Sequence, residues 1–124
     1  MTIDKKQILI IDDDFMNIRV LSHILDGGYD ILTATNGKRG IEMAHEFFPD
    51  LILLDIEMPE MDGYEVIAKL KEDRKLKNIP VLFVTGNNAA DDEWRGLQAG
   101  AVGYIGKPFH SGLIRREVME ALAR

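Results

Sequence analysis

Two short apolar runs in this sequence are each followed at once by aspartates. The run at 8–11 precedes Asp12 and Asp13, and the run at 51–54 precedes Asp55. Runs of four aliphatic residues are typical of buried strands, and the strands of a parallel sheet carry their carboxyl ends to one edge. We therefore expect these carboxylates to meet at that edge, with Asp55 presented by a rigid strand as a nucleophile.

Carboxylates gathered at one edge repel each other and favour a bound cation. Two unit charges about 4 Å apart repel by roughly 1 kcal/mol in water and by about 4 kcal/mol at an effective dielectric constant of about 20. Oxygen ligands with no imidazole or thiolate among them select a hard ion, and so small a set suits Mg²⁺ better than Ca²⁺. We therefore predict a Mg²⁺ site at Asp12, Asp13 and Asp55.

Two further residues complete a set that is suited to phosphoryl transfer. Thr85 and Lys107 each follow another apolar run, so they should lie at the same edge of the sheet. A carboxylate such as that of Asp55 can attack phosphorus to form an aspartyl phosphate. Because phosphoryl transfer depends on positioning and charge neutralisation, Lys107 would hold the transferring oxygens together with Mg²⁺, and the Thr85 hydroxyl would donate a hydrogen bond.

These residues require a scaffold in which strands and helices alternate. Five apolar runs, each followed by a segment with helical spacing, lie at residues 8–11, 31–34, 51–54, 81–84 and 102–105. Strands that are almost wholly apolar and alternate with helices predict an α/β fold, with a parallel sheet covered on both faces and right-handed crossovers. Helix start signals agree with this reading, at Asn36, at Asp62 with Glu65, and at Ser111.

Helical spacing also predicts which side chains face the sheet. In the second helix Ile41, Ala44 and Phe47 share one stripe and should be buried together. In the fourth helix Trp94 lies three residues before Leu97, so we expect the indole to be partly packed. Each helix is thus predicted to cover the sheet with a single face.

The composition narrows the class of protein. With 124 residues and 46% hydrophobic content, the chain fits one domain spanning 1–124, and the absence of cysteine excludes thiol chemistry and Cys-liganded zinc. The apolar runs are far shorter than the roughly 20 residues that cross a bilayer, and no signal-peptide core opens the sequence, so we expect a cytoplasmic protein without membrane contact. The net charge of −6 argues against direct nucleic-acid binding.

Four motifs together resemble the receiver domain of response regulators in two-component signalling. They are Ile-Ile-Asp-Asp-Asp at 10–14, Leu-Asp-Ile-Glu-Met-Pro-Glu-Met-Asp-Gly at 54–63, Val-Thr-Gly at 84–86, and Gly-Tyr-Ile-Gly-Lys-Pro-Phe at 103–109. The resemblance covers essentially the whole chain. It implies a CheY-like, flavodoxin-like (βα)5 sandwich of three layers, with a five-stranded parallel sheet in the order 2-1-3-4-5.

The resemblance also implies a role for each residue of the site. Asp55 would be the phosphoacceptor, and the Lys107-Pro108 bond would often be cis. The other implied roles belong to Asp12 and Asp13 as the acidic metal-binding pair, to Glu57 as a metal ligand through its backbone carbonyl, to Thr85 and Lys107 as the phosphate-sensing pair, and to Tyr104 as the switch aromatic.

Partners and output follow from the same resemblance. A histidine kinase or a phosphotransfer protein would supply the phosphoryl group, and the surface of the fourth helix, fifth strand and fifth helix would change its affinity for a downstream protein or output domain. A phosphorylation-dependent homodimer is common in such proteins. The domain would promote its own phosphorylation and dephosphorylation without being a turnover enzyme. The stretch 95–104 resembles receivers attached to cyclic-dinucleotide enzymes, so the chain could be a stand-alone regulator or the receiver portion of a longer one.

Two alternatives and several departures stay open at this level. A haloacid-dehalogenase-type phosphatase also uses an aspartyl phosphate and Mg²⁺, although its nucleophile follows the first strand; a receiver fold can also act as an unphosphorylated interaction module. Gly106 stands where the family usually places a bulkier residue and Gly103 where many relatives carry a polar one, and the added backbone freedom could loosen Lys107. Glu57 and Asn87 occupy positions that tune loss of the phosphoryl group in the family, without fixing a lifetime here.

Overall fold

The computed structural model describes residues 5–86 and 89–124 as five parallel strands alternating with five helices. The strands form one sheet in the order β2-β1-β3-β4-β5, which confirms the predicted topology. The strands are β1 (Gln7–Ile11), β2 (Asp30–Ala34), β3 (Leu51–Asp55), β4 (Val81–Thr85) and β5 (Gly103–Gly106).

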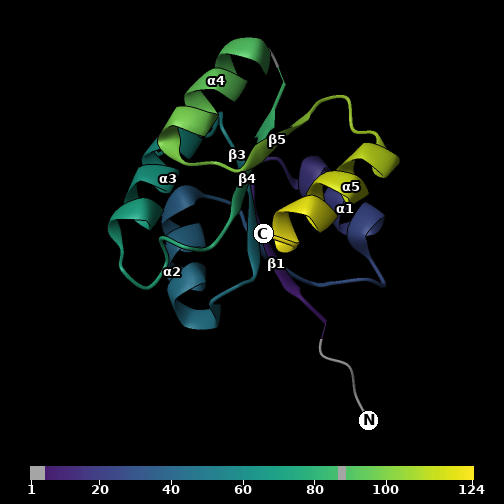
Figure 1. Ribbon diagram of the computed structural model, residues 1–124, viewed down its shortest axis with the longest axis horizontal. Coiled ribbons are helices and arrows are strands. Elements are labelled where there is room, and N and C mark those ends of the chain that lie inside the picture. Colours follow the sequence, from purple (N-terminus) through teal and green to yellow (C-terminus); the bar gives the residue numbers. More distant parts are fainter. Residues whose placement is uncertain (1–4, 87–88) are drawn as a thin grey trace.

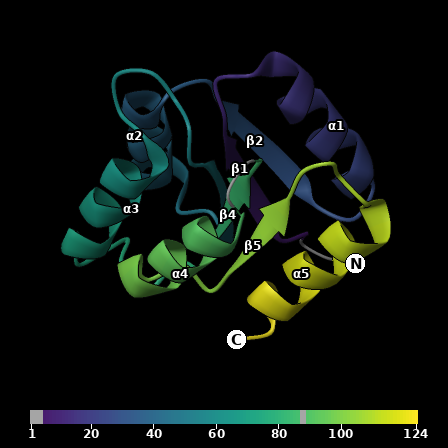
Figure 2. The ribbon, with the colours of Figure 1, turned by 90° about the horizontal axis from the view of Figure 1, so that it is seen from above.

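The helices cover both faces of the sheet, and Figures 1 and 2 show the three layers. Helices α1 and α5 lie on one face, whereas α2, α3 and α4 lie on the other, as the view from above makes plain (Figure 2). The helices are α1 (Phe15–Leu25), α2 (Gly37–Phe47), α3 (Gly63–Glu72), α4 (Ala89–Ala99) and α5 (Ser111–Leu122).

The three central strands form the buried framework of the molecule. All residues of β3 and β4 are buried, as are the last four residues of β1. Alternate side chains therefore enter two separate cores, one beneath α1 and α5 and the other beneath α2, α3 and α4. The edge strands β2 and β5 are more exposed, so the most rigid part of the sheet is the part that ends in Asp55 and Thr85.

Local signals fix where most helices begin. The Asp14 carboxylate accepts a hydrogen bond from the Met16 backbone N–H and caps α1, and the Asn36 side chain caps α2. Asp62 and Glu65 form the predicted reciprocal capping box of α3. The fifth helix does begin at Ser111, but its N-cap residue is His110, which makes no side-chain cap hydrogen bond.

Three details differ from the sequence predictions. Phe47 is exposed, because α2 ends at this residue and the left-handed backbone of Phe48 then carries the chain away from the core. Trp94 of α4 is 66% exposed, so most of its surface is in contact with solvent and the predicted packing is not formed. Strand β5 is shifted by one residue from the predicted run at 102–105.

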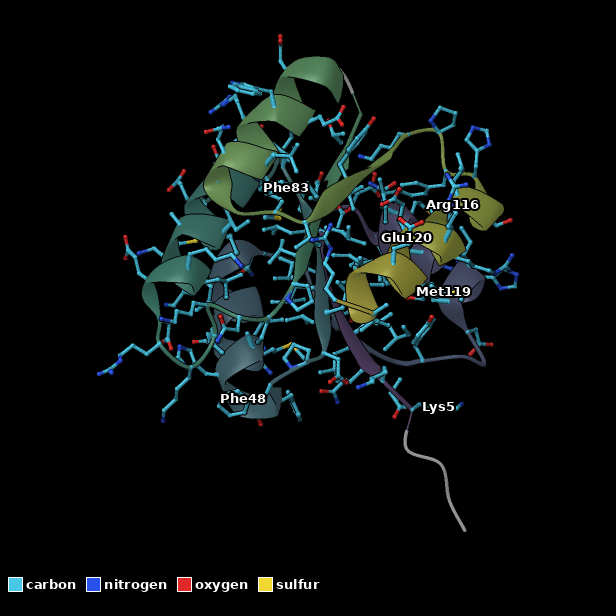
Figure 3. All side chains as sticks on the ribbon, in the orientation of Figure 1. Lys5, Phe48, Phe83, Arg116, Met119 and Glu120 are labelled. Atoms are coloured by element: carbon cyan, nitrogen blue, oxygen red, sulfur yellow. The ribbon has the colours of Figure 1, made fainter. Side chains whose placement is uncertain are left out.

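Two glycines allow helices to approach the sheet at close range. A Cβ atom at Gly63 would lie 2.6 Å from the carbonyl oxygen of Asp55 and 2.8 Å from Cα of Ile56, so any side chain there would displace the start of α3. A Cβ atom at Gly96 would lie 2.7 Å from the ring of Phe83, which is buried beneath α4 (Figure 3).

Within the described ranges, no helix has both the length and the apolar character needed to cross a bilayer.

Candidate functional site

Three carboxylates from two neighbouring strands meet at the carboxyl edge of the sheet. Asp12 and Asp13 follow β1, Asp55 is the last residue of β3, and these two strands pair directly. One carboxylate oxygen of each aspartate lies within 4.8 Å of the others. Asp12 and Asp55 are buried, with 1% and 5% of their surface exposed, whereas Asp13 is exposed. The structure thus brings together the acids that the sequence placed at one edge.

Hydrogen bonds hold the Asp12 side chain in place. Its Oδ1 accepts from the Asp14 backbone N–H at 2.9 Å, and its Oδ2 accepts from Nδ2 of Asn17 at 3.2 Å. Asn17 lies in α1, away from any strand end or motif that marks the site in the sequence. These contacts orient Asp12 toward the cluster without neutralising its charge.

Burial makes the charge of the cluster costly. Loss of solvation raises the pKa of Asp12 above its ordinary value. Loss of solvation, followed by the repulsion of the Asp12 carboxylate, raises the pKa of Asp55 to about 7, although the positive charge of Lys107 acts in the opposite direction. Without a cation, the cluster therefore binds protons that aspartates in water release near pH 4.

The raised pKa of Asp55 predicts a pH-dependent stability in metal-free solution. The folded state binds the Asp55 proton up to about pH 7, whereas the unfolded chain releases it near pH 3.8, so this contribution is present at low pH and is lost as the pH rises through 7. We expect the free energy of unfolding of the native protein in EDTA to fall, relative to that of Asp55→Asn, by about 2 kcal/mol between pH 5 and pH 8.

Urea denaturation at the two pH values measures this difference. Asp30→Asn, which removes an exposed carboxylate at the start of β2, is the matched control and should keep the native pH dependence. Equal pH dependence in the native protein and in Asp55→Asn would show that Asp55 is not held in a proton-binding environment.

The donor set of the cluster fits Mg²⁺. It consists of carboxylate oxygens alone, with no imidazole or thiolate among the grouped residues, and hard oxygen donors in small number are the ligands that Mg²⁺ prefers. Two of the three carboxylates are buried, so a divalent cation would offset the loss of solvation that raises both pKa values and the repulsion from Asp12 that further raises that of Asp55.

A cavity of about 480 Å³ adjoins the acids and collects the other predicted residues. Asp55, Glu57, Thr85 and Lys107 all line it. Thr85 ends β4, the strand beside β3, and the Lys107 backbone N–H donates to the Thr85 carbonyl at 2.9 Å, which ties the turn after β5 to the site. The Lys107-Pro108 bond is cis, as the sequence resemblance implied. Nothing lies within 4 Å of a Cβ placed at Gly106, so packing does not require glycine there.

The Thr85 hydroxyl also takes part in a contact that the sequence did not suggest. It donates to Oδ2 of Asp92 on α4 at 2.6 Å, and the hydroxyl of Tyr64 on α3 donates to Oδ1 of the same carboxylate at 3.0 Å. The Arg95 guanidinium stacks over the Tyr64 ring, 4.0 Å from its centroid. The Asp92 carboxylate on α4 therefore links Thr85, at the end of β4, to Tyr64 on α3.

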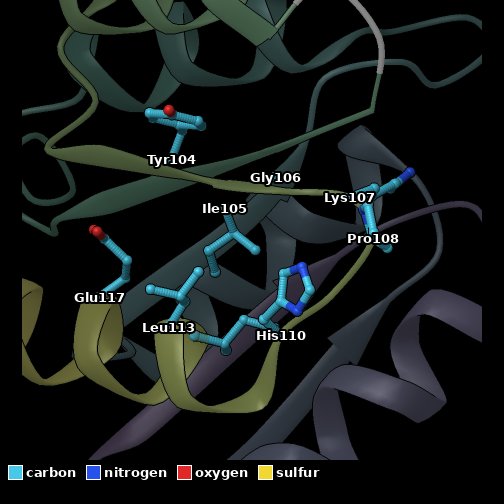
Figure 4. Close-up of a pocket in the computed structure, with 9 residues that line it drawn as sticks. Tyr104, Ile105, Gly106, Lys107, Pro108, His110, Leu113 and Glu117 are labelled. Carbon is cyan, nitrogen blue, oxygen red and sulfur yellow. The ribbon is translucent and has the colours of Figure 1, made fainter.

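Tyr104, the predicted switch residue, lies on β5 and is partly buried. It packs against the core beneath α2, α3 and α4, and the nearby Glu93 carboxylate raises the pKa of its phenol. Figure 4 shows Tyr104 on one side of β5, with Leu113 and Glu117 of α5 on the other. A groove of about 360 Å³ runs between β5 and α5, and it reaches Lys107 at one end.

Comparison with known families agrees with this geometry. The family model of the response regulator receiver domain matches residues 8–119 of the sequence, which include every strand end described above. The chain belongs to the response regulator receiver domain family. Receiver domains are phosphoacceptor switches of two-component signalling, and phosphorylation on aspartate and Mg²⁺ binding at an acidic pocket are typical of them. The haloacid-dehalogenase alternative is therefore set aside.

Known proteins similar to this receiver domain include both longer regulators and solved structures. It is 43% identical over 111 residues to a probable cyclic di-GMP phosphodiesterase of Vibrio cholerae, covering 90% of this chain but 25% of that protein. A putative response regulator from Chloroflexus aurantiacus superposes with a TM-score of 0.94 at 29% identity, covering 98% of this chain and all of the other.

A third relative is informative about the metal. The receiver domain of the sensor histidine kinase PA1611 from Pseudomonas aeruginosa, solved with a magnesium ion coordinated in its active site cleft, superposes with a TM-score of 0.88 at 26% identity. The match covers 97% of this chain and 99% of that one.

Receiver domains of this kind interact with histidine kinases and output domains. Asn87, predicted to tune phosphoryl loss, lies outside the described residues.

Proposed function

We propose that Asp55 of this receiver domain accepts a phosphoryl group from a histidine kinase or a phosphotransfer protein. The observation that carries the proposal is a buried carboxylate at a strand end that faces a cavity together with Thr85 and Lys107. A carboxylate oxygen of Asp55 attacks phosphorus, the phosphorus–nitrogen bond of the donor phosphohistidine breaks, and the bonding electrons leave with the imidazole. The product is an aspartyl phosphate.

Each residue of the site has a defined task in this step. The Lys107 ammonium offsets negative charge on the transferring oxygens, and the Thr85 hydroxyl donates to one of them in the phosphorylated state. Asp12, Asp13, Asp55 and the backbone carbonyl of Glu57 would hold Mg²⁺. When bound, Mg²⁺ supplies positive charge that offsets the carboxylates and keeps coordination positions open for phosphoryl oxygens.

The output is a change of surface, and the domain is a switch instead of a turnover enzyme. Movement of Thr85 and Lys107 toward the phosphoryl group would let Tyr104 occupy the vacated space. The face of α4, β5 and α5 would then change its affinity for a downstream protein or output domain, or for a second copy of the chain. We place this domain in the cytoplasm, as a single receiver that either stands alone or regulates an attached domain, consistent with the long Vibrio relative.

Intact-mass measurement tests the proposal on the native protein. Incubation with acetyl phosphate and Mg²⁺ should add one phosphoryl group, and a phosphorylated histidine kinase domain should add the same mass faster. Hydroxylamine, which cleaves acyl phosphates, should remove it. No mass gain from either donor would overturn the proposal in favour of an unphosphorylated interaction module.

A further inference from the structure

The Thr85 hydroxyl has one proton to donate, and in this structure Asp92 receives it. The donor–acceptor distance of 2.6 Å is shorter than that of a typical neutral O–H···O bond and is the distance expected of a charge-assisted hydrogen bond to a carboxylate. A phosphoryl group on Asp55 would require the same proton. The two acceptors therefore compete, and Thr85 cannot satisfy both.

The other carboxylate oxygen of Asp92 also accepts a hydrogen bond. The Tyr64 hydroxyl donates to it at 3.0 Å, the Tyr64 ring packs 5.3 Å from that of buried Phe83, and Arg95 stacks on the outer face of the Tyr64 ring. Loss of solvation, and then the hydrogen bond to Asp92, raise the pKa of Tyr64 to about 12, so this donor keeps its proton at physiological pH.

We propose that Asp92 is a positioning residue that holds the Thr85 hydroxyl away from Asp55 and thereby stabilises the unphosphorylated state. This inference rests on the function proposed above and adds a residue to it. Phosphorylation of Asp55 withdraws the Thr85 proton from Asp92, which releases α4 from the end of β4. Asp92, Tyr64 and Arg95 line a cavity of about 630 Å³ beside the loop between β3 and α3, so the change reaches that face as well as the face that carries Tyr104.

The first test is the rate of phosphoryl uptake from acetyl phosphate in saturating Mg²⁺, followed by intact mass. Asp92→Ala should react about threefold to tenfold faster than the native protein, because it removes an interaction made only in the unphosphorylated state. Asp91→Ala is the matched control: it removes an exposed carboxylate from the same turn of α4 and should react at the native rate.

A second pair of proteins separates positioning from a general loosening of α4. In the Thr85→Val background, which keeps the branched shape but lacks the hydroxyl, Asp92→Ala should no longer accelerate uptake. Amide hydrogen exchange of the α4 backbone, measured without phosphodonor, should be at least about three times faster in Asp92→Ala than in Asp91→Ala.

Each outcome bears on one of the two proposals. Uptake by Asp92→Ala at the rate of Asp91→Ala overturns the positioning role, and so does acceleration that persists in Thr85→Val. If the native protein takes up no phosphoryl group from acetyl phosphate or from a kinase, the proposed function fails. The exchange of α4 then decides by itself whether Asp92 holds that helix to Thr85: equal exchange in Asp91→Ala and Asp92→Ala overturns it.

Discussion

Asp55→Asn is expected to lower phosphoryl uptake at least about 100-fold, to below detection by intact mass. The amide keeps the size of the carboxylate and the buried position at the end of β3, but its oxygen is a poor nucleophile toward phosphorus. The protein should remain folded, since the substitution removes a carboxylate whose pKa burial raises to about 7. Uptake is measured with acetyl phosphate and Mg²⁺, and again with a phosphorylated histidine kinase domain.

Glu57→Gln is the control for charge at the mouth of the same cavity. Glu57 is exposed and lies two residues from Asp55, and its proposed metal contact is through the backbone, which the substitution leaves in place. Glu57→Gln should therefore still become phosphorylated. Phosphorylation of Asp55→Asn to the native extent would place the acceptor elsewhere, and peptide mapping would then locate it among the neighbouring carboxylates.

Asp13→Asn is expected to weaken Mg²⁺ binding by about tenfold or more, and complete removal of Mg²⁺ with EDTA should lower the rate of phosphoryl uptake at least about 100-fold. Asp13 is the exposed member of the cluster, so its substitution removes one charged ligand without creating a buried defect. At low Mg²⁺ concentration uptake should fall in proportion to the affinity, and saturating Mg²⁺ should restore most of it.

Asp14→Asn provides a control that differs by one position. It removes the same charge from the same loop, and asparagine caps a helix as well as aspartate, so α1 should keep its start. Titration calorimetry with MgCl₂ measures the affinities directly. Equal losses in the two variants would mean that the acidic loop attracts the cation through its net charge, and that Asp13 is not a ligand.

The acidic cluster could be predicted from the sequence because the ends of buried strands can be recognised there. An apolar run of four residues marks a buried strand, and in a parallel sheet the residue after such a run falls at the ligand-binding edge whatever the helices do. Asp12, Asp13, Asp55, Thr85 and Lys107 were all found by this one rule, and the structure brings them to one edge. Their individual roles in phosphoryl transfer stay predictions until the variants are measured.

The role of Asp92 could not be predicted from the sequence in the same way. Asp91 and Asp92 are adjacent acids in the first turn of α4, and which one faces Thr85 depends on how that helix is rotated about its axis. The prediction that Phe47 is buried was wrong for a related reason. Helical spacing predicts a stripe of apolar side chains but does not say where the last turn of the helix leaves the surface of the sheet. Side chains near helix ends depend on geometry that periodicity alone does not carry.

The position of Lys107 beyond β5 has a consequence for biosynthesis. β5 is the edge strand beside β4, and of the five strands of this sheet it is the last to leave the ribosome. The acids that follow β1 and end β3 emerge earlier, so a nascent chain carries all three carboxylates before Lys107 is available. On the function proposed above, a chain that stalls before Lys107 carries the acids of the receiver without a complete acceptor site.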